Sequence, residues 1–256
     1  MIYGFPNEQA DTARVACRLA QAIEQKEPCS LISMADGESA VLWGAKGFGS
    51  FHYLSAWGFS AEDRLGVAEQ LAAAIPKCDI VCLPRSGTQA SQPGMGPRLR
   101  EALYLWDIRP KPEALIGDSL ISFYLLFDCW LWSLMENRKV LVVTSEAEKV
   151  VAALNGRQPP VGLATFAGGQ WWRQAETTGI MLADGLAGSA QCLVDAGNLP
   201  WKPDLCLLGA GSRAAHLAVA LAEMHSMPVI ELGCVFSWFH TPSEPATIFK
   251  LYQEEG

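Results

Sequence analysis

Apolar residues along this chain fall into short uninterrupted runs, which longer amphipathic stretches separate. A short apolar run bounded by turn residues is typical of a strand buried in a parallel sheet. The strands predicted in this way are residues 31–34, 79–83, 139–144, 161–166, 205–208 and 229–231. Because strands and helices alternate, the pattern predicts a Rossmann-like α/β fold with a mainly parallel sheet and helices on both faces.

The amphipathic stretches predict the helices that cover this sheet. In residues 7–26 apolar positions recur at helical spacing, and we expect the opposite face to be acidic and solvated. Further helical patterns occupy residues 60–75, 146–154 and 171–196, with glycine interruptions in the last of these, and a final one ends at Met224.

An aromatic-rich apolar stretch runs from Leu120 to Met135. It is too short to cross a bilayer, which needs roughly 20 apolar residues, and Asp128 interrupts it. We therefore expect no transmembrane segment here and a buried helix instead. The aromatic side chains also suit a subunit interface in a homo-oligomer, or a groove for an acceptor.

Composition limits the classes of partner. The 256 residues fit one large α/β domain or two tightly joined halves, and we expect a single domain over residues 1–256. The net charge is −8 and no basic stripe is visible, so nucleic acid is not an expected partner. The N-terminus lacks the pattern of a secretory signal, which predicts a cytoplasmic protein. The eight cysteines have no C-x-x-C spacing, and we expect reduced, mostly packed thiols.

An acidic turn follows the first predicted strand. Asp36, Gly37 and Glu38 come directly after Ala35, and helix-compatible spacing resumes at Ser39. In open α/β sheets, ligands bind at the carboxyl ends of strands. Gly37 permits a tight turn in which the carboxylates of Asp36 and Glu38 converge on a hard divalent cation. The alternative is that the two acids only open a helix, whose dipole they complement.

Two blocks of the chain resemble one known family. The run from Ser30 to Glu38 is similar to the Asp-X-Glu segment of the GT-D-fold glycosyltransferases, a group formerly catalogued as a domain of unknown function. The block from Pro203 to Ser237 resembles the C-terminal part of that family, where a strand, a small-residue turn, a helix and another strand lead to a D-I-G-H-like segment. This chain has Ser33 where the family usually has an arginine shortly before the acids. It has Glu-Leu-Gly-Cys, beginning at Glu231, in place of D-I-G-H.

The resemblance implies a GT-D-type fold and the transfer of a sugar from a nucleotide-sugar donor, with a UDP-sugar expected, to a glycan or another hydroxyl acceptor. It also implies that Asp36 and Glu38 work through Mn²⁺ or Mg²⁺. Such a cation neutralises the charge that develops on the leaving diphosphate. Glu231 is our candidate for the base that deprotonates the acceptor.

Arg85 and Ser86 follow the second predicted strand and begin an unusually long loop. Long loops of this kind are often functional, and a guanidinium at the carboxyl end of a strand can clamp a diphosphate with two parallel hydrogen bonds. The alternative is a solvent-facing arginine in a mobile loop. The glycine-rich loop at residues 46–50 is a weaker candidate, because it lacks the spacing of a phosphate-binding P-loop.

A second glycine-rich turn lies between the strand at residues 205–208 and the helix that follows. Gly209, Gly211 and Ala214 have the Gly-x-Gly-x-x-Ala spacing of a dinucleotide-binding turn, and Glu231 follows twenty residues after Gly211. An NAD(P)-binding oxidoreductase is therefore an alternative, as is a non-catalytic protein of the same fold. Under either enzymatic hypothesis, Gly209, Gly211 and Ser212 would let a phosphate approach a helix N-terminus.

Overall fold

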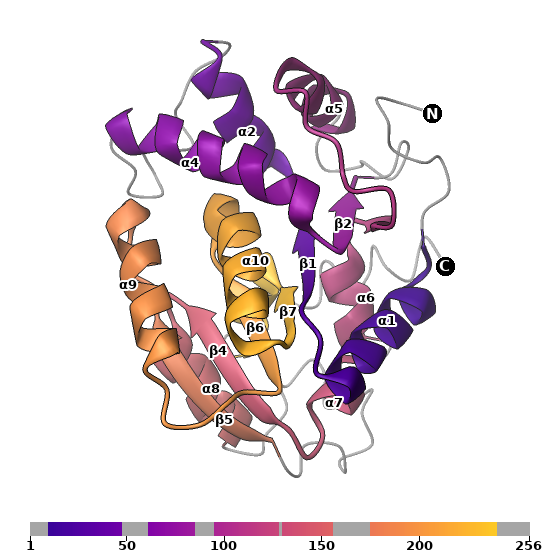
Figure 1. Cartoon of the computed structure of the whole chain (residues 1–256), viewed down its shortest axis with the longest axis vertical. Helices are drawn as coiled ribbons and strands as arrows, with labels where there is room; N and C mark the ends of the chain where they lie inside the picture. The colour runs from indigo at the N-terminus through magenta and orange to yellow at the C-terminus, as the bar shows by residue number, and fades with distance from the viewer. Residues whose placement is uncertain (1–9, 48–60, 85–94, 128–129, 156–174, 240–256) are drawn as a thin grey trace.

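The sheet at the centre of the molecule contains seven described strands, all of them parallel (Figure 1). In this computed structural model, residues 10–47, 61–84, 95–127, 130–155 and 175–239 are described. The order across the sheet is β3-β2-β1-β7-β6-β4-β5. The strands are β1 (Cys29–Ser33), β2 (Ile80–Leu83), β3 (Leu115–Asp118), β4 (Lys139–Thr144), β5 (Glu176–Met181), β6 (Leu205–Gly209) and β7 (Pro228–Glu231).

Helices cover both faces of this sheet, which confirms the predicted Rossmann-like α/β fold (Figure 1). One face packs against α2 (Asp36–Ala45), α4 (Ala61–Ala74), α5 (Met95–Leu105), α9 (Gly185–Gly197) and α10 (Ala214–His225). The other packs against α1 (Thr12–Gln25), α6 (Ile121–Phe127), α7 (Trp130–Met135) and α8 (Ala147–Asn155). Three 3₁₀ helices complete the described elements: η1 (Ile75–Lys77), η2 (Gly211–Arg213) and η3 (Gly233–Phe239).

The apolar runs became strands because the sheet is buried on both sides. In β4, Val140 and Val142 join the apolar cluster on one face, whereas Leu141 and Val143 join the cluster on the other. A strand covered on both faces needs apolar residues at every position, so its sequence is an uninterrupted run. Every predicted strand in the described residues is present, and the one predicted at residues 161–166 lies outside them.

The prediction of a helical pattern through residues 171–196 is wrong in its first part. Residues 171–174 lie outside the described part of the chain, and β5 is an edge strand that pairs with β4 in register from Glu176 to Met181. Thr177, Thr178 and Ile180 are β-branched, and pairing with the buried strand β4 overrides the weak, glycine-interrupted helical pattern. The helix begins only at α9.

The aromatic stretch from Leu120 to Met135 contains two helices, α6 and α7, where we expected one. The two helices contact each other and α1. Leu125, Leu131 and Trp132 are buried, in agreement with the expected core position, whereas Trp130 is exposed. A homo-oligomer interface through this stretch stays a prediction. Among the described helices, each is too short or too polar to span a bilayer.

Helix α1 differs from expectation in the charge of its outer face. Its N-terminus is capped by Asp11, whose carboxylate accepts a hydrogen bond of 2.7 Å from the backbone N–H of Arg14. Val15 and Leu19 are buried against the sheet. The opposite face is not acidic as expected, because it carries Arg14 and Arg18, which lie one helical turn apart.

Candidate functional site

The carboxyl ends of β1 and β7 lie side by side at one edge of the sheet. After β1 the chain enters α2 on one face, and after β7 it enters η3, whose residues pack on the opposite face. Adjacent strands whose connections leave toward opposite faces open a crevice, where α/β proteins bind their ligands. Helix α2 also contacts η2, which follows β6. The acidic turn and the glycine-rich turn, far apart in the sequence, therefore lie at the same edge.

Glu38 is directed back over the N-terminus of α2. Its Oε2 atom accepts a hydrogen bond of 2.8 Å from the backbone N–H of Ala35, the residue that precedes the helix. Only 9% of Glu38 is exposed. This bond satisfies one of the backbone donors that every helix start leaves unpaired. The helix-opening role that we considered as the alternative is therefore present for Glu38.

Asp36 and Gly37 are the first two residues of α2. Gly37 is buried, and the side chain of Asp36 lies outside the described part of the structure. The convergence of the Asp36 and Glu38 carboxylates on a cation stays a prediction. Arg85 and Ser86 also lie outside the described residues, as does most of the loop that begins at Lys46.

Glu231 ends β7 at the same edge of the sheet and is buried, with 4% of the residue exposed. Its Oε2 atom accepts a hydrogen bond of 3.2 Å from the backbone N–H of Ser33, at the end of β1. Burial, and next the negative charge of Glu38, raise the pKa of Glu231 from 4.5 to about 8. Hydrogen bonds from the backbone N–H groups of Ser33 and Gly233 act in the opposite direction.

Gly233 permits this carboxylate to lie close to the backbone that follows β7. Its φ of +53° is in the left-handed region, and a Cβ atom there would lie 3.1 Å from Glu231 Oε1. The Glu-Leu-Gly segment is thus a compact turn that holds the Glu231 carboxylate against the end of β1. Cys234, the last residue of that segment, has a side chain outside the described part of the structure.

Several polar groups beside Glu231 were not found from the sequence. Ser33 Oγ donates a hydrogen bond of 2.6 Å to the carbonyl of Ser119, and Ser122 Oγ donates one of 3.0 Å to the carbonyl of Glu231. Asp118 at the end of β3 is buried, and its Oδ1 atom accepts from the N–H of Leu120 at 2.9 Å. Asp118 could have been found from the sequence as an acid at the end of a short apolar strand. The strand itself was not predicted, because β3 has only four residues.

The thiol of Cys82 lies within range of the charges of both Asp118 and Glu231. Burial raises the pKa of Cys82 well above its usual value, and the negative charges of Asp118 and Glu231 raise it further. Cys82 is in β2, between β3 and β1 in the sheet. The carboxyl ends of β3, β2, β1 and β7 therefore form a continuous polar edge with three buried acids, Glu38, Asp118 and Glu231.

The glycine-rich turn after β6 contributes to the packing of the core. A Cβ atom on Gly209 would lie 2.4 Å from Phe236 Cδ2, so this glycine makes room for an aromatic ring of η3. Gly211 has a φ of +51° and open space where a Cβ would be. The Ser212 hydroxyl is buried without a hydrogen-bond partner among the described residues.

The cation beside this turn is engaged in holding the fold. Arg213 Nη1 donates hydrogen bonds to the carbonyls of Ala183 at 2.6 Å and Gly185 at 2.8 Å. Burial lowers the pKa of its guanidinium, and the nearby Asp184 raises it. Arg213 thereby links the start of α10 to the loop between β5 and α9.

The described residues contain no group of three or more His, Cys, Asp or Glu side chains in metal-binding geometry. The chemistry of the acids nevertheless fits a hard cation. Carboxylate oxygens are the ligands that Mg²⁺ and Mn²⁺ prefer, and Glu38 and Glu231 are buried within range of each other's charge. Asp36 and Glu38 are the two carboxylates that would hold the cation, with Glu231 beside them as the candidate base.

Comparison with protein families assigns the chain to a class. Residues 10–239 match the family described as the GT-D fold-like domain, and the chain belongs to that family. The match includes both the acidic turn after β1 and the segment that ends β7. Comparisons with curated proteins and with solved structures gave no significant match.

Proposed function

We propose that this protein is a glycosyltransferase, which moves a sugar from a nucleotide-sugar donor, a UDP-sugar, to a hydroxyl group of a glycan or another acceptor. Membership of the GT-D fold-like family supports the reaction class. The observation that carries the proposal is the buried pair of acids, Glu38 and Glu231, in the crevice between β1 and β7.

Two like charges in a buried crevice destabilise the folded protein, because each disfavours the ionised form of the other. Such an arrangement is typical of sites where a proton or a cation is handled. The carboxylate of Glu231 makes no ion pair with any described residue. Among the described residues, the groups that offset this repulsion at Glu231 are the backbone N–H groups of Ser33 and Gly233, which carry no net charge. A functional role explains why both acids are present.

In the proposed site, Asp36 and Glu38 would hold Mn²⁺ or Mg²⁺. When bound, this cation supplies positive charge that stabilises the departing nucleoside diphosphate. Glu231 accepts the proton of the acceptor hydroxyl, and its raised pKa makes it a stronger base near neutral pH than an ordinary carboxylate.

The turn after β6 would contact the donor's diphosphate. Open space beside Gly211 and the buried, unpartnered hydroxyl of Ser212 support this role. Backbone N–H groups at the start of a helical segment favour an anion. Arg85 and Ser86, which follow β2, are the further anion contacts in the proposal. Gly209 has a packing role beside Phe236 and is not needed for the donor contact.

Substitution of the acids tests the mechanism. We expect Asp36→Asn and Glu38→Gln each to lower transfer from a UDP-sugar at saturating Mn²⁺ by about 100-fold or more, because an amide is a weaker ligand for a hard cation. Donor hydrolysis and transfer to an acceptor are the measurements, and circular dichroism verifies the fold.

A matched control separates this effect from the loss of a charge at a helix start. Glu148 lies in the first turn of α8 and is exposed, so Glu148→Gln removes the same kind of charge away from the crevice. It should leave transfer unchanged. Wild-type turnover in both Asp36→Asn and Glu38→Gln would contradict the mechanism.

Thermal melting distinguishes the oxidoreductase alternative, because a ligand that binds the native state raises the melting temperature. We expect a rise with UDP-sugars plus Mn²⁺ and none with NAD(H). The reverse result would favour the dinucleotide hypothesis for the Gly209 to Ser212 turn. No rise with either ligand, together with no transfer, would favour a non-catalytic protein.

A further inference from the structure

A pocket lies at the amino ends of β2 and β3, at the opposite edge of the sheet from Glu38 and Glu231. Its volume is about 450 Å³, which is in the range of small-molecule sites. Asp79, which precedes β2, and Leu115, which opens β3, line it together with Lys111 and Glu113 from the segment before β3. Helix α1 forms the remaining wall. Because β2 has four residues, its length separates the pocket from the opposite edge by about 13 Å.

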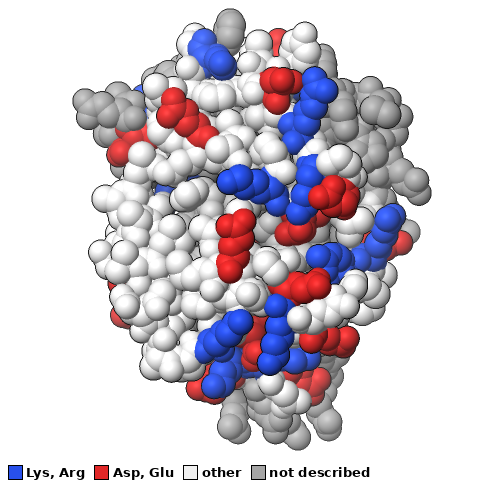
Figure 2. Space-filling view, viewed as in Figure 1, with Lys and Arg blue, Asp and Glu red and all other residues white. Residues whose placement is uncertain are grey.

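One stripe of α1 faces this pocket. Arg14, Cys17, Arg18 and Gln21 all line it, and their spacing of three and four residues places them on one side of the helix. The opposite side of α1 is anchored by apolar residues that are buried against the sheet. The direction in which the polar stripe faces is therefore fixed by the core. Figure 2 shows charged side chains gathered on the part of the surface where α1 lies, whereas the surface over α9 is largely uncharged.

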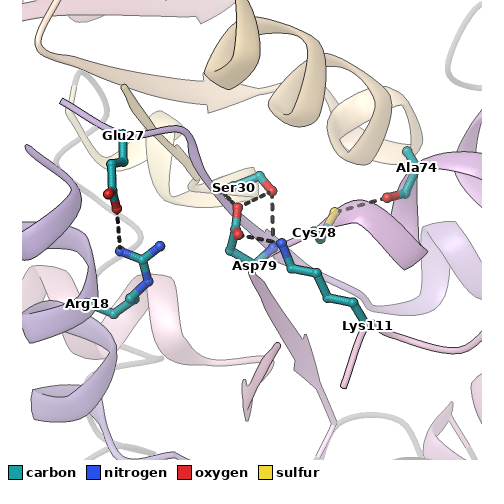
Figure 3. A network of polar contacts seen from close by, with 7 residues as sticks. All are labelled: Arg18, Glu27, Ser30, Ala74, Cys78, Asp79 and Lys111. Carbon is teal, nitrogen blue, oxygen red and sulfur yellow. Dashed lines mark hydrogen bonds and ion pairs between the residues drawn. The ribbon is translucent and has the colours of Figure 1, made fainter. Parts of the chain in front are cut away.

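The acid nearest the strands is fully engaged within the protein (Figure 3). Asp79 Oδ2 accepts hydrogen bonds from the N–H and the hydroxyl of Ser30, at 2.7 and 3.2 Å. Its Oδ1 atom accepts from Lys111 Nζ at 2.6 Å. Lys111 balances the charge of this carboxylate and still has N–H donors to offer. Asp79 therefore opposes an anion in the pocket only weakly.

The two arginines are less engaged than Asp79. Arg18 lies 3.9 Å from Glu27 in a long ion pair, and its side chain is 29% exposed (Figure 3). Arg14 is exposed and makes no ion pair with any described residue. With Lys111, they give the lining three cations against two acids, Asp79 and Glu113, and Glu27 beside Arg18 is a third acid. Because Asp79 is paired with Lys111 and Glu27 is 3.9 Å from Arg18, both guanidinium groups keep N–H donors for an anionic ligand.

We propose that this pocket binds a small phosphate-bearing molecule, with the phosphate between the guanidinium groups of Arg14 and Arg18 and Lys111 as the third cation. Arginine presents a planar fork of N–H donors that matches phosphate oxygens. Glu113, on the pocket wall, accepts a hydrogen bond from a hydroxyl on the organic part of the ligand. The site is separate from the proposed transfer site and does not depend on it.

The reactivity of the Cys17 thiol reports whether a ligand occupies the pocket. It lines the pocket and is exposed, whereas the other described free cysteines, at positions 29, 78, 82, 192 and 206, are buried. Thiol reagents attack accessible thiolates, so Cys17 should be modified much faster than those buried thiols. Burial raises the pKa of Cys29 and of Cys78 to about 12, which slows their reaction further. A ligand bound at the crevice would not shield Cys17.

The experiment measures alkylation of Cys17 by iodoacetamide, with peptide mapping by mass spectrometry, while inorganic phosphate is titrated at constant ionic strength. We expect saturable protection, with alkylation about 10-fold slower when phosphate is at ten times its Kd. Sodium chloride at the same ionic strength should protect little. Absence of protection, or equal protection by chloride, would overturn the proposal.

Variants test whether Arg14 and Arg18 are responsible for the protection of Cys17 by phosphate. Protection is the ratio of the Cys17 alkylation rates without and with phosphate in the same protein, so a change in the intrinsic reactivity of the thiol does not affect it. In the double variant Arg14→Gln/Arg18→Gln this ratio should fall to about one. Arg109, an exposed arginine paired with Asp107 at 3.1 Å, lies outside the pocket, so Arg109→Gln is the matched control and should keep full protection. Protection of the double variant equal to that of the wild type would overturn the assignment.

Discussion

The two edges of the sheet hold acids in opposite electrostatic surroundings. At the amino edge, Asp79 lies 2.6 Å from the ammonium of Lys111 and accepts two hydrogen bonds from Ser30. At the carboxyl edge, Glu231 accepts backbone hydrogen bonds, and the nearby charge is another acid, Glu38. An acid with a cation and donors supports the fold, whereas buried acids that repel one another weaken it. The amino edge is therefore organised for stability, and the carboxyl edge for chemistry.

Replacement of Glu231 should have the largest effect on stability, and its sign should be favourable. Because the folded protein raises the pKa of Glu231 from 4.5 to about 8, the folded state holds a proton that the unfolded state releases between these values. Stability should fall as the pH rises from about 4.5 and level off above about 8. Glu231→Gln removes this pH-dependent loss of stability, so we expect the variant to be more stable than wild type at pH 9 by up to about 5 kcal/mol.

Urea denaturation of Glu231→Gln and wild type between pH 4 and pH 9 is the measurement. The difference between the two proteins should grow steadily across this window, because it follows the titration of one group. A difference in the free energy of unfolding that is constant with pH would show that burial and Glu38 do not raise the pKa of Glu231. The same variant should lose transfer activity, since Glu231 is the proposed base.

Replacement of Asp79 should have the opposite sign. In Asp79→Asn, the amide can accept from Ser30, but its NH₂ group then faces the ammonium of Lys111. We expect a loss of about 2 kcal/mol in the free energy of unfolding, since a partly buried charged hydrogen bond is broken and a cation is left without its partner. Chemical denaturation at pH 7 measures this.

Lys111→Met is the matched variant for this edge. It removes the cation and leaves the Asp79 carboxylate with its hydrogen bonds from Ser30. Asp79→Asn instead leaves the Lys111 ammonium facing an amide NH₂ group, so Lys111→Met should cost less. The Lys111 side chain is 26% exposed, and water weakens the ion pair accordingly. An equal or larger loss in Lys111→Met would contradict this ranking, because it would mean that the uncompensated carboxylate costs as much as the uncompensated ammonium.

The smallest expected effect concerns the capping role of Glu38. At pH 6 the raised pKa keeps Glu231 protonated, so Glu38 has no neighbouring charge there to repel. At this pH Glu38→Ala removes the acceptor of the Ala35 N–H and should cost about 1 kcal/mol of stability, whereas Glu38→Gln retains an acceptor and should cost less. Both variants should lose transfer if the carboxylate is needed for the cation. Denaturation and transfer assays on the same two proteins therefore separate the cap from the chemistry. Equal stability of the two variants would contradict the capping role.

The sequence by itself predicted the central strands and the place of the acidic turn. Strands such as β4 and β6 are buried on both faces, so their runs of apolar residues are visible without any knowledge of their neighbours. The acidic turn could be placed because a turn motif directly follows such a run. Edge strands were harder to predict. β5 has exposed positions and a glycine, and it forms a strand because β4 supplies its hydrogen-bond partners.

Only the tertiary structure decided which residues meet. The order of the strands places β7 beside β1, and this brings Glu231 against Glu38 and Ser33, although nothing in the sequence around either acid specifies that neighbour. The same topology places Lys111 beside Asp79 and opposite the arginines of α1. Hydrophobic patterning records whether a position is buried, because burial depends on the face of its own element. It does not record the partner across the sheet, because many strand orders bury the same residues, and charge and hydrogen bonding act between those partners.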